Sequence, residues 1–399
     1  MNIKTKAASF WWLAFSISFA TLFVACENPG SIGSEFIEKS EINVDTIQVS
    51  NLIESNQDAY LGRLSRSAIG RFQDGLAGEI EAISFFKPSI QRSSDTLIFD
   101  DNTNLSLRLQ LYEDEVYGDT SSTGTYSIYR VSSSWRGSTF RNSSDIIFDE
   151  GELIGQFSDA TADTNGIIYV ELTGSWKDDY INFFNMADDT RDEAYKAGDF
   201  GLAVIPDAGN SKIVYANYTL SNLTSFDSDT TSRFILDWGV DIDRTGEVDN
   251  PERIILDSNF DKILRFNLAE IADQIGNKNF ARVAIEFKID TLALSSSLAD
   301  GEVRSSALGM SLKFGPLSDI PFDLGFGSLE FSTVNNNGFY RFNLTGLLNN
   351  YLYGEASVSD AYVYLTASSG SLAYTSIYLD DSNPENNPKL IVYGIEGEE

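Results

Sequence analysis

From residue 42 onward, hydrophobic and polar residues mostly alternate with a period of two. In the segment 105–112 four leucines fall on one face, and Ser106, Arg108 and Gln110 fall on the other. This alternation is typical of antiparallel strands with one buried face. Similar short runs recur between clusters of glycine, asparagine, aspartate and serine, which favour turns; the clearest are 126–131, 167–172, 200–205 and 234–238.

Helical periodicity is scarce along the chain. The best helix candidate is the segment 268–275, Leu-Ala-Glu-Ile-Ala-Asp-Gln-Ile, which is long enough for about two turns. The pattern as a whole therefore predicts an all-β protein.

The two halves of the chain repeat one another. Tyr-Val-Glu-Leu-Thr-Gly at 169–174 resembles Arg-Phe-Asn-Leu-Thr-Gly at 341–346. Other pieces correspond in the same order: 105–112 with 283–289, 199–205 with 360–366, 213–215 with 372–374, and 233–239 with 389–394. Ordered repetition of β-rich pieces predicts two tandem β-sandwiches. We expect the first domain at 41–240 and the second at 258–399, joined by an acidic interdomain loop at 241–257.

Several phrases resemble DNRLRE-type jelly-roll domains. They are Ser-Ile-Tyr-Arg-Val-Ser-Ser-Ser-Trp at 127–135, the segments 169–174 and 201–205, and the closing 387–393. The resemblance implies a jelly-roll fold, similar to carbohydrate-binding modules, in both halves. Such domains occur beside bacterial carbohydrate-active enzymes and on surface proteins, and some bind polysaccharide. The second half lacks the Ser-Ser-Trp phrase, so the halves are not expected to be functionally equal.

The first 26 residues form a cationic start, an apolar run and a cysteine. Lys4 and Lys6 precede the apolar segment 7–25, which ends at Phe23-Val-Ala-Cys26. A transmembrane anchor is one interpretation, because 19 residues can nearly span a bilayer. A small residue before the sole cysteine resembles a bacterial lipobox, with Phe23 in the place of the usual leucine. This resemblance favours a cleaved signal peptide at 1–25 and a fatty-acylated Cys26 that attaches the chain to a membrane, followed by a tether at 26–40.

The start of the mature chain resembles a family of Bacteroidota lipoproteins catalogued only as a domain of unknown function. The resemblance rests on Cys-Glu-Asn-Pro-Gly-Ser-Ile-Gly-Ser at 26–34, Ile-Asn-Val-Asp-Thr-Ile-Gln-Val at 42–49, Leu-Gly-Arg at 61–63 and Gly-Arg-Phe at 70–72. It implies a lipid-anchored protein of the cell envelope, at the outer membrane. Whether the chain faces the periplasm or the outside stays open, and the resemblance implies no activity.

Composition excludes several classes of function. The chain has 59 acidic and 28 basic residues, a formal charge of −31, which argues against nucleic-acid binding. It has no histidine and one cysteine. Ser-His and Cys-His nucleophiles, histidine-ligated zinc and an internal disulfide are therefore excluded. We expect no enzymatic activity; a glycoside hydrolase based on two carboxylates is the remote alternative.

One acidic segment has the spacing of an EF-hand calcium loop. Acids or hydroxyls stand at positions 1, 3, 5, 7, 9 and 12 of the segment 241–252, with glycine at position 6; these residues are Asp241, Asp243, Thr245, Glu247, Asp249 and Glu252. Strand-like flanks and Pro251 disfavour a helix-loop-helix. Calcium at the junction of the halves is one hypothesis, and a solvated acidic turn is the other.

Three tryptophans follow the expected cleavage site. Trp135 and Trp176 stand in polar surroundings, whereas Trp238 lies in a predicted strand and is expected in the core. Aromatic faces stack on sugar rings, so Trp135 and Trp176 are candidate ligand contacts; packing in the core is the alternative for each. The sequence thus favours a lipid-anchored, non-catalytic module that binds polysaccharide. A structural or adhesion scaffold for another envelope protein is the second hypothesis.

Overall fold

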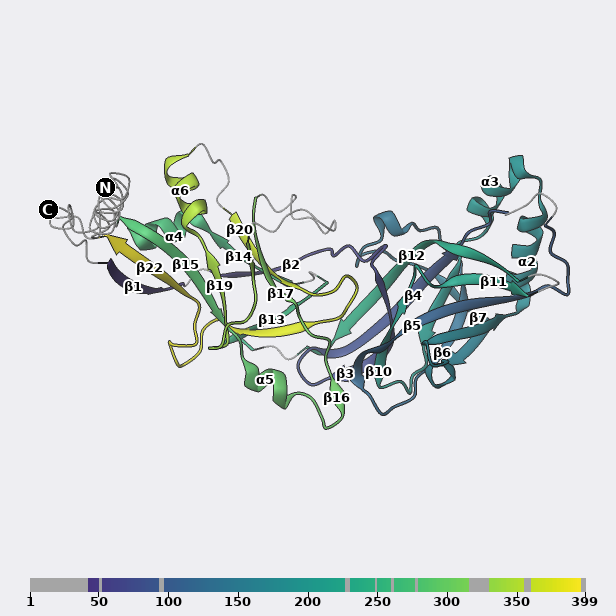
Figure 1. Ribbon diagram of the computed structural model, residues 1–399, viewed down its shortest axis with the longest axis horizontal. Helices are drawn as coiled ribbons and strands as arrows, with labels where there is room; N and C mark the ends of the chain where they lie inside the picture. Colours follow the sequence, from purple (N-terminus) through teal and green to yellow (C-terminus); the bar gives the residue numbers. More distant parts are fainter. Residues whose placement is uncertain are drawn as a thin grey trace, which may run out of the picture.

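The computed structural model describes residues 42–49, 52–92, 97–226, 230–247, 250–259, 262–276, 279–315, 330–354 and 360–395. Within them the chain forms antiparallel strands in two lobes placed end to end (Figure 1). This confirms the all-β prediction. In the described ranges no helix is both long and apolar enough to cross a membrane. The expected signal peptide, Cys26 and the tether lie outside the described residues.

The first lobe is formed mainly by the residues from Arg66 to Thr245. Its strands are β3 (Arg66–Asp74), β4 (Gly78–Pro88), β5 (Asn104–Asp119), β6 (Thr125–Val131), β7 (Phe148–Ser158), β8 (Ile167–Leu172), β9 (Leu202–Pro206), β10 (Lys212–Asn217), β11 (Asn222–Phe226) and β12 (Thr231–Thr245). Its helices are α2 (Gly174–Asn185), α3 (Asp188–Gly198) and the short η1 (Gly137–Thr139) and η2 (Asp159–Thr161). Two long strands, β5 and β12, change pairing partners along their length. Strand β5 pairs first with β11 and then with β10, and β12 pairs first with β11 and then with β4. The two strands thereby connect the layer that contains β11 to the layer that contains β10 and β4.

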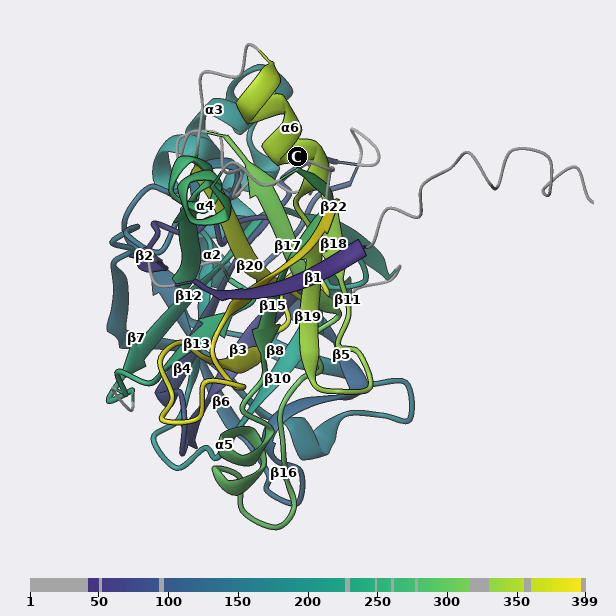
Figure 2. The same ribbon diagram turned by 90° about the vertical axis from the view of Figure 1, so that its left-hand side faces the viewer.

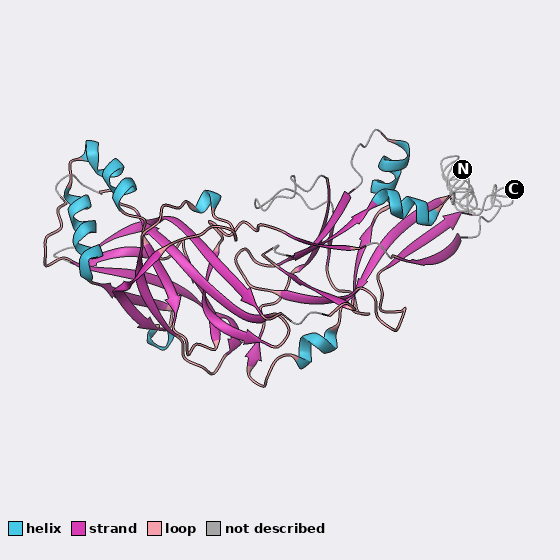
Figure 3. Ribbon diagram, turned by 180° about the vertical axis from the view of Figure 1, so that it is seen from behind, coloured by secondary structure: helices cyan, strands magenta, loops and turns pink. Residues whose placement is uncertain are grey.

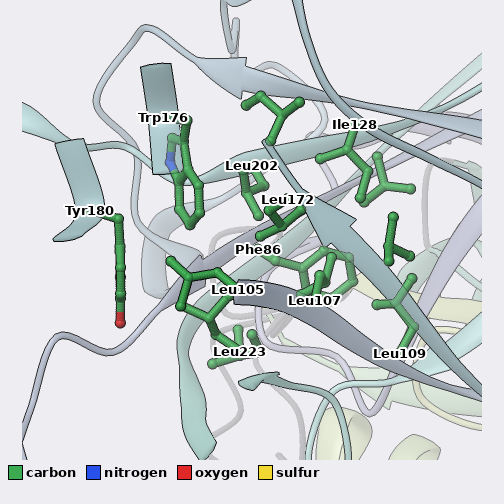
Figure 4. Close-up of a cluster of buried hydrophobic side chains, with 14 of the residues drawn as sticks. Phe86, Leu105, Leu107, Leu109, Ile128, Leu172, Trp176, Tyr180, Leu202 and Leu223 are labelled. Atoms are coloured by element: carbon green, nitrogen blue, oxygen red, sulfur yellow. The ribbon is translucent and has the colours of Figure 1, made fainter. Parts of the chain in front are cut away.

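The core of the first lobe lies between these two layers. The leucines at 105, 107 and 109 of β5 face Phe86 of β4 and Leu202 of β9, and all are buried (Figure 4). The period-two prediction for 105–112 is therefore confirmed. Alternate residues of a strand point to one face, so the leucines fill the core while Arg108 and Gln110 remain partly exposed.

The second lobe consists of two smaller facing sheets. One contains β1 (Ile42–Gln48), β22 (Lys389–Ile395), β15 (Phe280–Lys288) and β19 (Phe339–Asn343). The other contains β18 (Glu330–Ser332), β17 (Gly309–Phe314), β20 (Asp360–Thr366), β14 (Lys262–Asn267) and β2 (Ile53–Asn56). A further pair joins β13 (Arg253–Asp257) to β21 (Tyr374–Tyr378), and the helices are α4 (Leu268–Ile275), α5 (Thr291–Ser296) and α6 (Thr345–Tyr353). Buried side chains of the two facing sheets form one core.

Strand pairing repeats between the lobes. The antiparallel pairs β5–β8, β4–β9, β6–β9 and β3–β10 of the first lobe have the counterparts β15–β19, β14–β20, β17–β20 and β13–β21 in the second. A helix follows the same strand in each, α2 after β8 and α6 after β19. The pieces at 233–239 and 389–394 differ in this respect, because β12 pairs with β11 and β4 whereas β22 pairs with β1 and β15.

The domain boundaries differ from the expected ones. Strands β1 and β2, expected in the first domain, pair with β22 and β14 of the second lobe. Strand β12 continues to Thr245 within the first lobe, and β13 at 253–257 already belongs to the second. The short β16 (Glu302–Val303) returns to pair with β5. Strand pairing across hundreds of residues decides these memberships, and the local sequence pattern does not carry that information.

The lobes share a buried contact. Phe72, Tyr117 and Tyr215 of the first lobe pack with Leu372 and Tyr374 of the second. The Tyr215 hydroxyl accepts a hydrogen bond from the backbone N–H of Leu372 at 3.1 Å. Figure 2, which views the molecule along its long axis, shows the two lobes one behind the other.

Helices are more numerous than the sequence pattern predicted. The helix expected at 268–275 is confirmed as α4. Helices α2 and α3 lie together at the far end of the first lobe, with α4 and α6 near the opposite end of the molecule (Figure 3). Trp176, Tyr180 and Phe184 recur every fourth residue and form the buried face of α2. This spacing is a helical signal that polar neighbours in the sequence obscured.

Candidate functional site

A cationic, aromatic cleft opens on the first lobe. It has a volume of about 610 Å³. Five separate segments meet there: the approach to β3, the end of β4, the loop from β6 through η1, the end of α3, and β12. The lining residues are Arg63, Lys87, Ser134, Trp135, Arg136, Ser138, Thr139, Lys196, Phe200, Leu236 and Asp237.

Trp135 is half-buried and lines this cleft. The chain leaves β6 after Val131, and Trp135 follows three serines that do not continue the strand. The indole Nε1 donates a hydrogen bond to the Phe200 carbonyl at 2.7 Å. Its ring lies 5.8 Å from that of Phe140 and 5.9 Å from that of Phe85, centroid to centroid. These contacts fix the ring while part of it borders the cleft, so Trp135 stays a candidate ligand contact.

Lys87 lies at the end of β4, just before Pro88, and is mostly buried. Its Nζ donates to the Asp199 carbonyl oxygen at 2.5 Å and lies 4.9 Å from the centroid of the Tyr195 ring. Burial is the main cause that lowers the pKa of Lys87, and the nearby cations Lys196 and Arg136 lower it further. Asp199 and Asp237 act in the opposite direction.

Arg63 and Asp237 form an ion pair in the lining of the cleft. The Arg63 Nε and Asp237 Oδ1 are 3.1 Å apart, and the same oxygen accepts from the Gly137 N–H at 2.8 Å. Arg63 has a φ of +53°, a left-handed conformation that costs about 1–2 kcal/mol for a residue other than glycine. A Cβ at position 137 would lie 2.3 Å from Asp237 Oδ1, so only glycine allows this contact. Strained backbone of this kind gathers at functional sites.

Arg136 and Lys196 are exposed cations of the cleft, as is Arg63, which Asp237 pairs with. Among the described residues neither Arg136 nor Lys196 forms an ion pair with a carboxylate. Because charges are screened over about 8 Å at physiological ionic strength, the local cations outweigh the remote acids that give the chain its charge of −31. The cleft therefore has a positive local potential that attracts anions, although the protein as a whole is acidic.

Asp199 lies beneath the cleft with its side chain fully buried. Burial raises the pKa of Asp199 to about 6, although the Gly201 N–H donates to its Oδ1 at 2.6 Å and Lys87 lies nearby. The carboxyl therefore supports the turn after α3 and is not exposed to a ligand.

One of the tryptophan predictions needs correction. Trp176 is completely buried between α2 and the sandwich core, with its ring 5.3 Å from that of Tyr180 (Figure 4). It cannot stack on a ligand in this structure, so its assignment as a ligand contact is wrong. Trp238, expected in the core, is partly buried and packs against the core cluster of the first lobe. Its indole stacks on Tyr218 at 3.6 Å between centroids and donates to the Leu64 carbonyl at 2.8 Å.

The EF-hand-like loop at 241–252 does not form. Asp241, Asp243 and Thr245 lie in β12, which pairs with β4 over this stretch. Alternate residues of a strand are about 6.7 Å apart, so these three oxygens spread along the strand and do not converge on one ion. Burial and the neighbouring acids Asp243 and Glu81 raise the pKa of Asp241 to about 6.

The remaining candidate ligands of that segment are also not brought together. Glu247 pairs with Lys262 at 2.7 Å, and Glu252 follows in the turn before β13. Asp249 lies outside the described residues. In the part of the chain that the structure describes, no three acidic side chains gather as metal ligands.

Most residues of the cleft were not predicted. Lys87, Lys196, Phe200 and Asp237 stand in unrelated stretches of the sequence, and strand register and the packing of α3 bring them together. Basic residues are few in this chain, 28 of 399, and that scarcity is the available sequence signal. Comparison with protein-family models, with curated proteins and with solved structures finds no match to this chain.

Proposed function

We propose that this protein is a non-catalytic module that binds an acidic polysaccharide in the cleft around Trp135. One observation carries the proposal: cationic side chains and a half-buried indole gather in one cleft of a strongly acidic protein. Arg136 and Lys196 would pair with carboxylate or sulfate groups of the ligand.

Aromatic and hydroxyl groups fit a sugar backbone. The faces of Trp135 and Phe200 can stack on the C–H faces of a pyranose, as aromatic residues do in ligand sites. The hydroxyls of Ser134, Ser138 and Thr139 lie around the same cleft and can exchange hydrogen bonds with sugar hydroxyls. A small inorganic anion would use the cations but not these aromatic faces.

The described residues of the cleft do not supply the two carboxyl groups that glycoside hydrolysis uses. That reaction uses two carboxyl groups on either side of the scissile bond. Among the described residues that line the cleft, Asp237 is the one acid, and Arg63 and the Gly137 N–H hold it. Binding without cleavage therefore fits the cleft better.

Membrane attachment through an acylated Cys26 would orient this module relative to the membrane. The described chain begins with β1, which pairs with β22 in the second lobe. An anchor upstream of β1 would hold the second lobe nearest the membrane and the cleft-bearing lobe farther away.

Cys26→Ala is expected to move the protein from the membrane to the soluble fraction, and unchanged partitioning after a carbonate wash would contradict the anchor.

Arg136→Ala and Lys196→Ala are each expected to weaken binding of an acidic polysaccharide roughly ten- to hundred-fold, because each removes a charge-assisted contact worth about 1.5–3 kcal/mol. Affinity is measured by isothermal titration with polygalacturonate, alginate, hyaluronan and dextran sulfate. The first three carry carboxylates and the last carries sulfates, so the panel separates the two anions. Methyl-esterified polygalacturonate keeps the sugar backbone without the charge and should bind weakly.

The matched control is Arg282→Ala, which removes one exposed positive charge from the second lobe and should leave affinity unchanged. Trp135→Ala tests the stacking contact without a change of charge. If the wild-type protein binds none of the four polymers, the proposal is wrong. If Arg282→Ala weakens binding as much as Arg136→Ala, the attraction is diffuse and the cleft is not the site.

A further inference from the structure

The outer face of one sheet of the first lobe carries a row of four side chains from four neighbouring strands. The strands are β8, β5, β11 and β12 (Figure 1 labels the last three). In register across them lie Tyr169, Arg108, Asn222 and Phe234. Directly opposite residues of antiparallel strands point to the same face. The row therefore has an aromatic ring at each end, with a cation and an amide between them. It spans about 14 Å at the usual spacing between strands.

Both ends of the row are exposed to solvent. Tyr169 is 53% and Phe234 54% exposed, although large aromatic side chains are usually mostly buried. Phe226 of β11 is 38% exposed, and its ring makes an edge-on contact with Tyr169 at 5.6 Å between centroids. This contact holds the Tyr169 ring in place on the surface. Exposed rings held in place on a sheet are suited to contact with a ligand.

The centre of the row is polar and cationic. Arg108 donates to the Leu220 carbonyl and to the Gln110 Oε1, the latter at 3.2 Å. In the described part of the chain it forms no ion pair, and a guanidinium has five N–H donors. Asn222 accepts from the Thr224 hydroxyl at 2.6 Å through its Oδ1, so its amide N–H groups remain available to a ligand.

This row is continuous with the cleft. Leu236, which lines the cleft, lies two residues beyond Phe234 on β12, at a β-bulge between Ile235 and Asp237, and both side chains are exposed. Two residues of chain span at most about 7 Å, so the two positions are close neighbours on the surface. An extended ligand that leaves the cleft past Leu236 thus meets Phe234 first, then Asn222 and Arg108, and finally Tyr169.

We propose that this face, formed by Tyr169, Arg108, Asn222 and Phe234, is a second subsite for the same acidic polysaccharide chain. The inference rests on the proposed function of the cleft. Tyr169 and Phe234 stack on sugar rings, Arg108 pairs with an acidic group, and Asn222 binds a hydroxyl. A flat protein partner would favour a more continuous apolar surface than a row with a cation and an amide at its centre.

Two linked subsites predict a dependence on chain length. Binding at the second subsite becomes intramolecular once one end of the polymer is held in the cleft, which raises the overall affinity strongly. The double variant Tyr169→Ala/Phe234→Ala is expected to bind the polymer selected in the panel above at least about ten-fold more weakly than the wild type. The trisaccharide of the same polymer, too short to occupy both subsites, should bind both proteins equally.

The control is Tyr353→Ala, which removes an exposed aromatic ring from α6 in the second lobe and should change neither affinity. Thermal melting verifies that the double variant is folded. If it binds the polymer as tightly as the wild type while Arg136→Ala does not, the second subsite is wrong and the cleft stands. If the wild type binds no polymer, both proposals fail.

Sedimentation of the wild type and the double variant tests a different use of the face. Both proteins are expected to have the same oligomeric state. If the wild type self-associates and Tyr169→Ala/Phe234→Ala does not, the face is an interface between copies of this chain, and the second-subsite proposal is overturned.

Discussion

Asp74→Ala is expected to lower the free energy of unfolding by about 3–5 kcal/mol, because it leaves a buried cation without its partner. Asp74 lies at the end of β3 with its side chain fully buried. Its two carboxylate oxygens accept from Arg304, which follows β16 and also donates to the Leu294 carbonyl in α5 of the second lobe; Nε to Oδ2 is 2.7 Å and Nη2 to Oδ1 is 2.6 Å. The Tyr117 hydroxyl also donates to Oδ2, at 2.6 Å. The backbone N–H groups of Leu76 and Ala77 donate to Oδ1 as well, so removing the carboxylate takes the acceptor from these two groups, from the Arg304 guanidinium and from the Tyr117 hydroxyl.

The effect should depend on pH. Burial alone would raise the pKa of Asp74, but hydrogen bonds from Arg304 and Tyr117 outweigh it, and the pKa lies below its ordinary value of 3.8. A lowered pKa contributes stability that is present above the unfolded-state value and is lost as pH falls through the folded-state value. Wild type and Asp74→Asn should therefore differ most near neutral pH and approach each other in strong acid.

Urea unfolding at 25 °C measures this prediction. Tryptophan fluorescence reports on the first lobe, because Trp135, Trp176 and Trp238 all lie there, and circular dichroism reports on both lobes. The control is Glu81→Ala, which breaks a partly exposed pair with Arg71 and should cost under about 1 kcal/mol. A loss for Asp74→Ala no larger than that of Glu81→Ala would show that the contact does not couple the lobes.

Strand content could be predicted from the sequence because it depends on local pattern. The alternation in 105–112 places four leucines on one side of any strand that the segment forms, whatever its neighbours are. The repeat of Leu-Thr-Gly at 172–174 and 344–346 likewise marks the start of a helix after a strand in each half. Lobe membership could not be predicted this way. Strand β1 joins the second lobe through a register with β22 that spans most of the chain.

The site could be predicted only in part. Trp135 follows a run of serines at a strand end, and that position favoured a surface role. Trp176 also stands among polar residues, yet those residues form the exposed face of a helix whose other face is core. The calcium spacing failed for a related reason, because side chains at 241, 243 and 245 converge in a loop but diverge along a strand. In both cases the secondary structure, and not the residue types, decided the role.

Trp176→Ala is expected to lower the free energy of unfolding by about 3–5 kcal/mol, the usual cost of truncating a buried large aromatic residue. The indole packs on Tyr180, whose hydroxyl donates to the Ser89 carbonyl at 2.6 Å, and together they join α2 to the sandwich. Trp176→Phe should recover much of the loss. It keeps an aromatic ring and removes an indole N–H that has no hydrogen-bond partner in the structure.

Comparison with Trp135→Ala separates a structural tryptophan from a ligand-binding one. Trp135 is only half-buried, so its truncation should cost less stability but should weaken binding of the acidic polysaccharide. Trp176→Phe should lower stability somewhat, and the protein that remains folded should bind the polymer with full affinity. Both variants are measured by urea unfolding and by titration with the same polymer. Reduced affinity in folded Trp176→Phe, with its stability unchanged, would return Trp176 to the ligand site and contradict its place in the core.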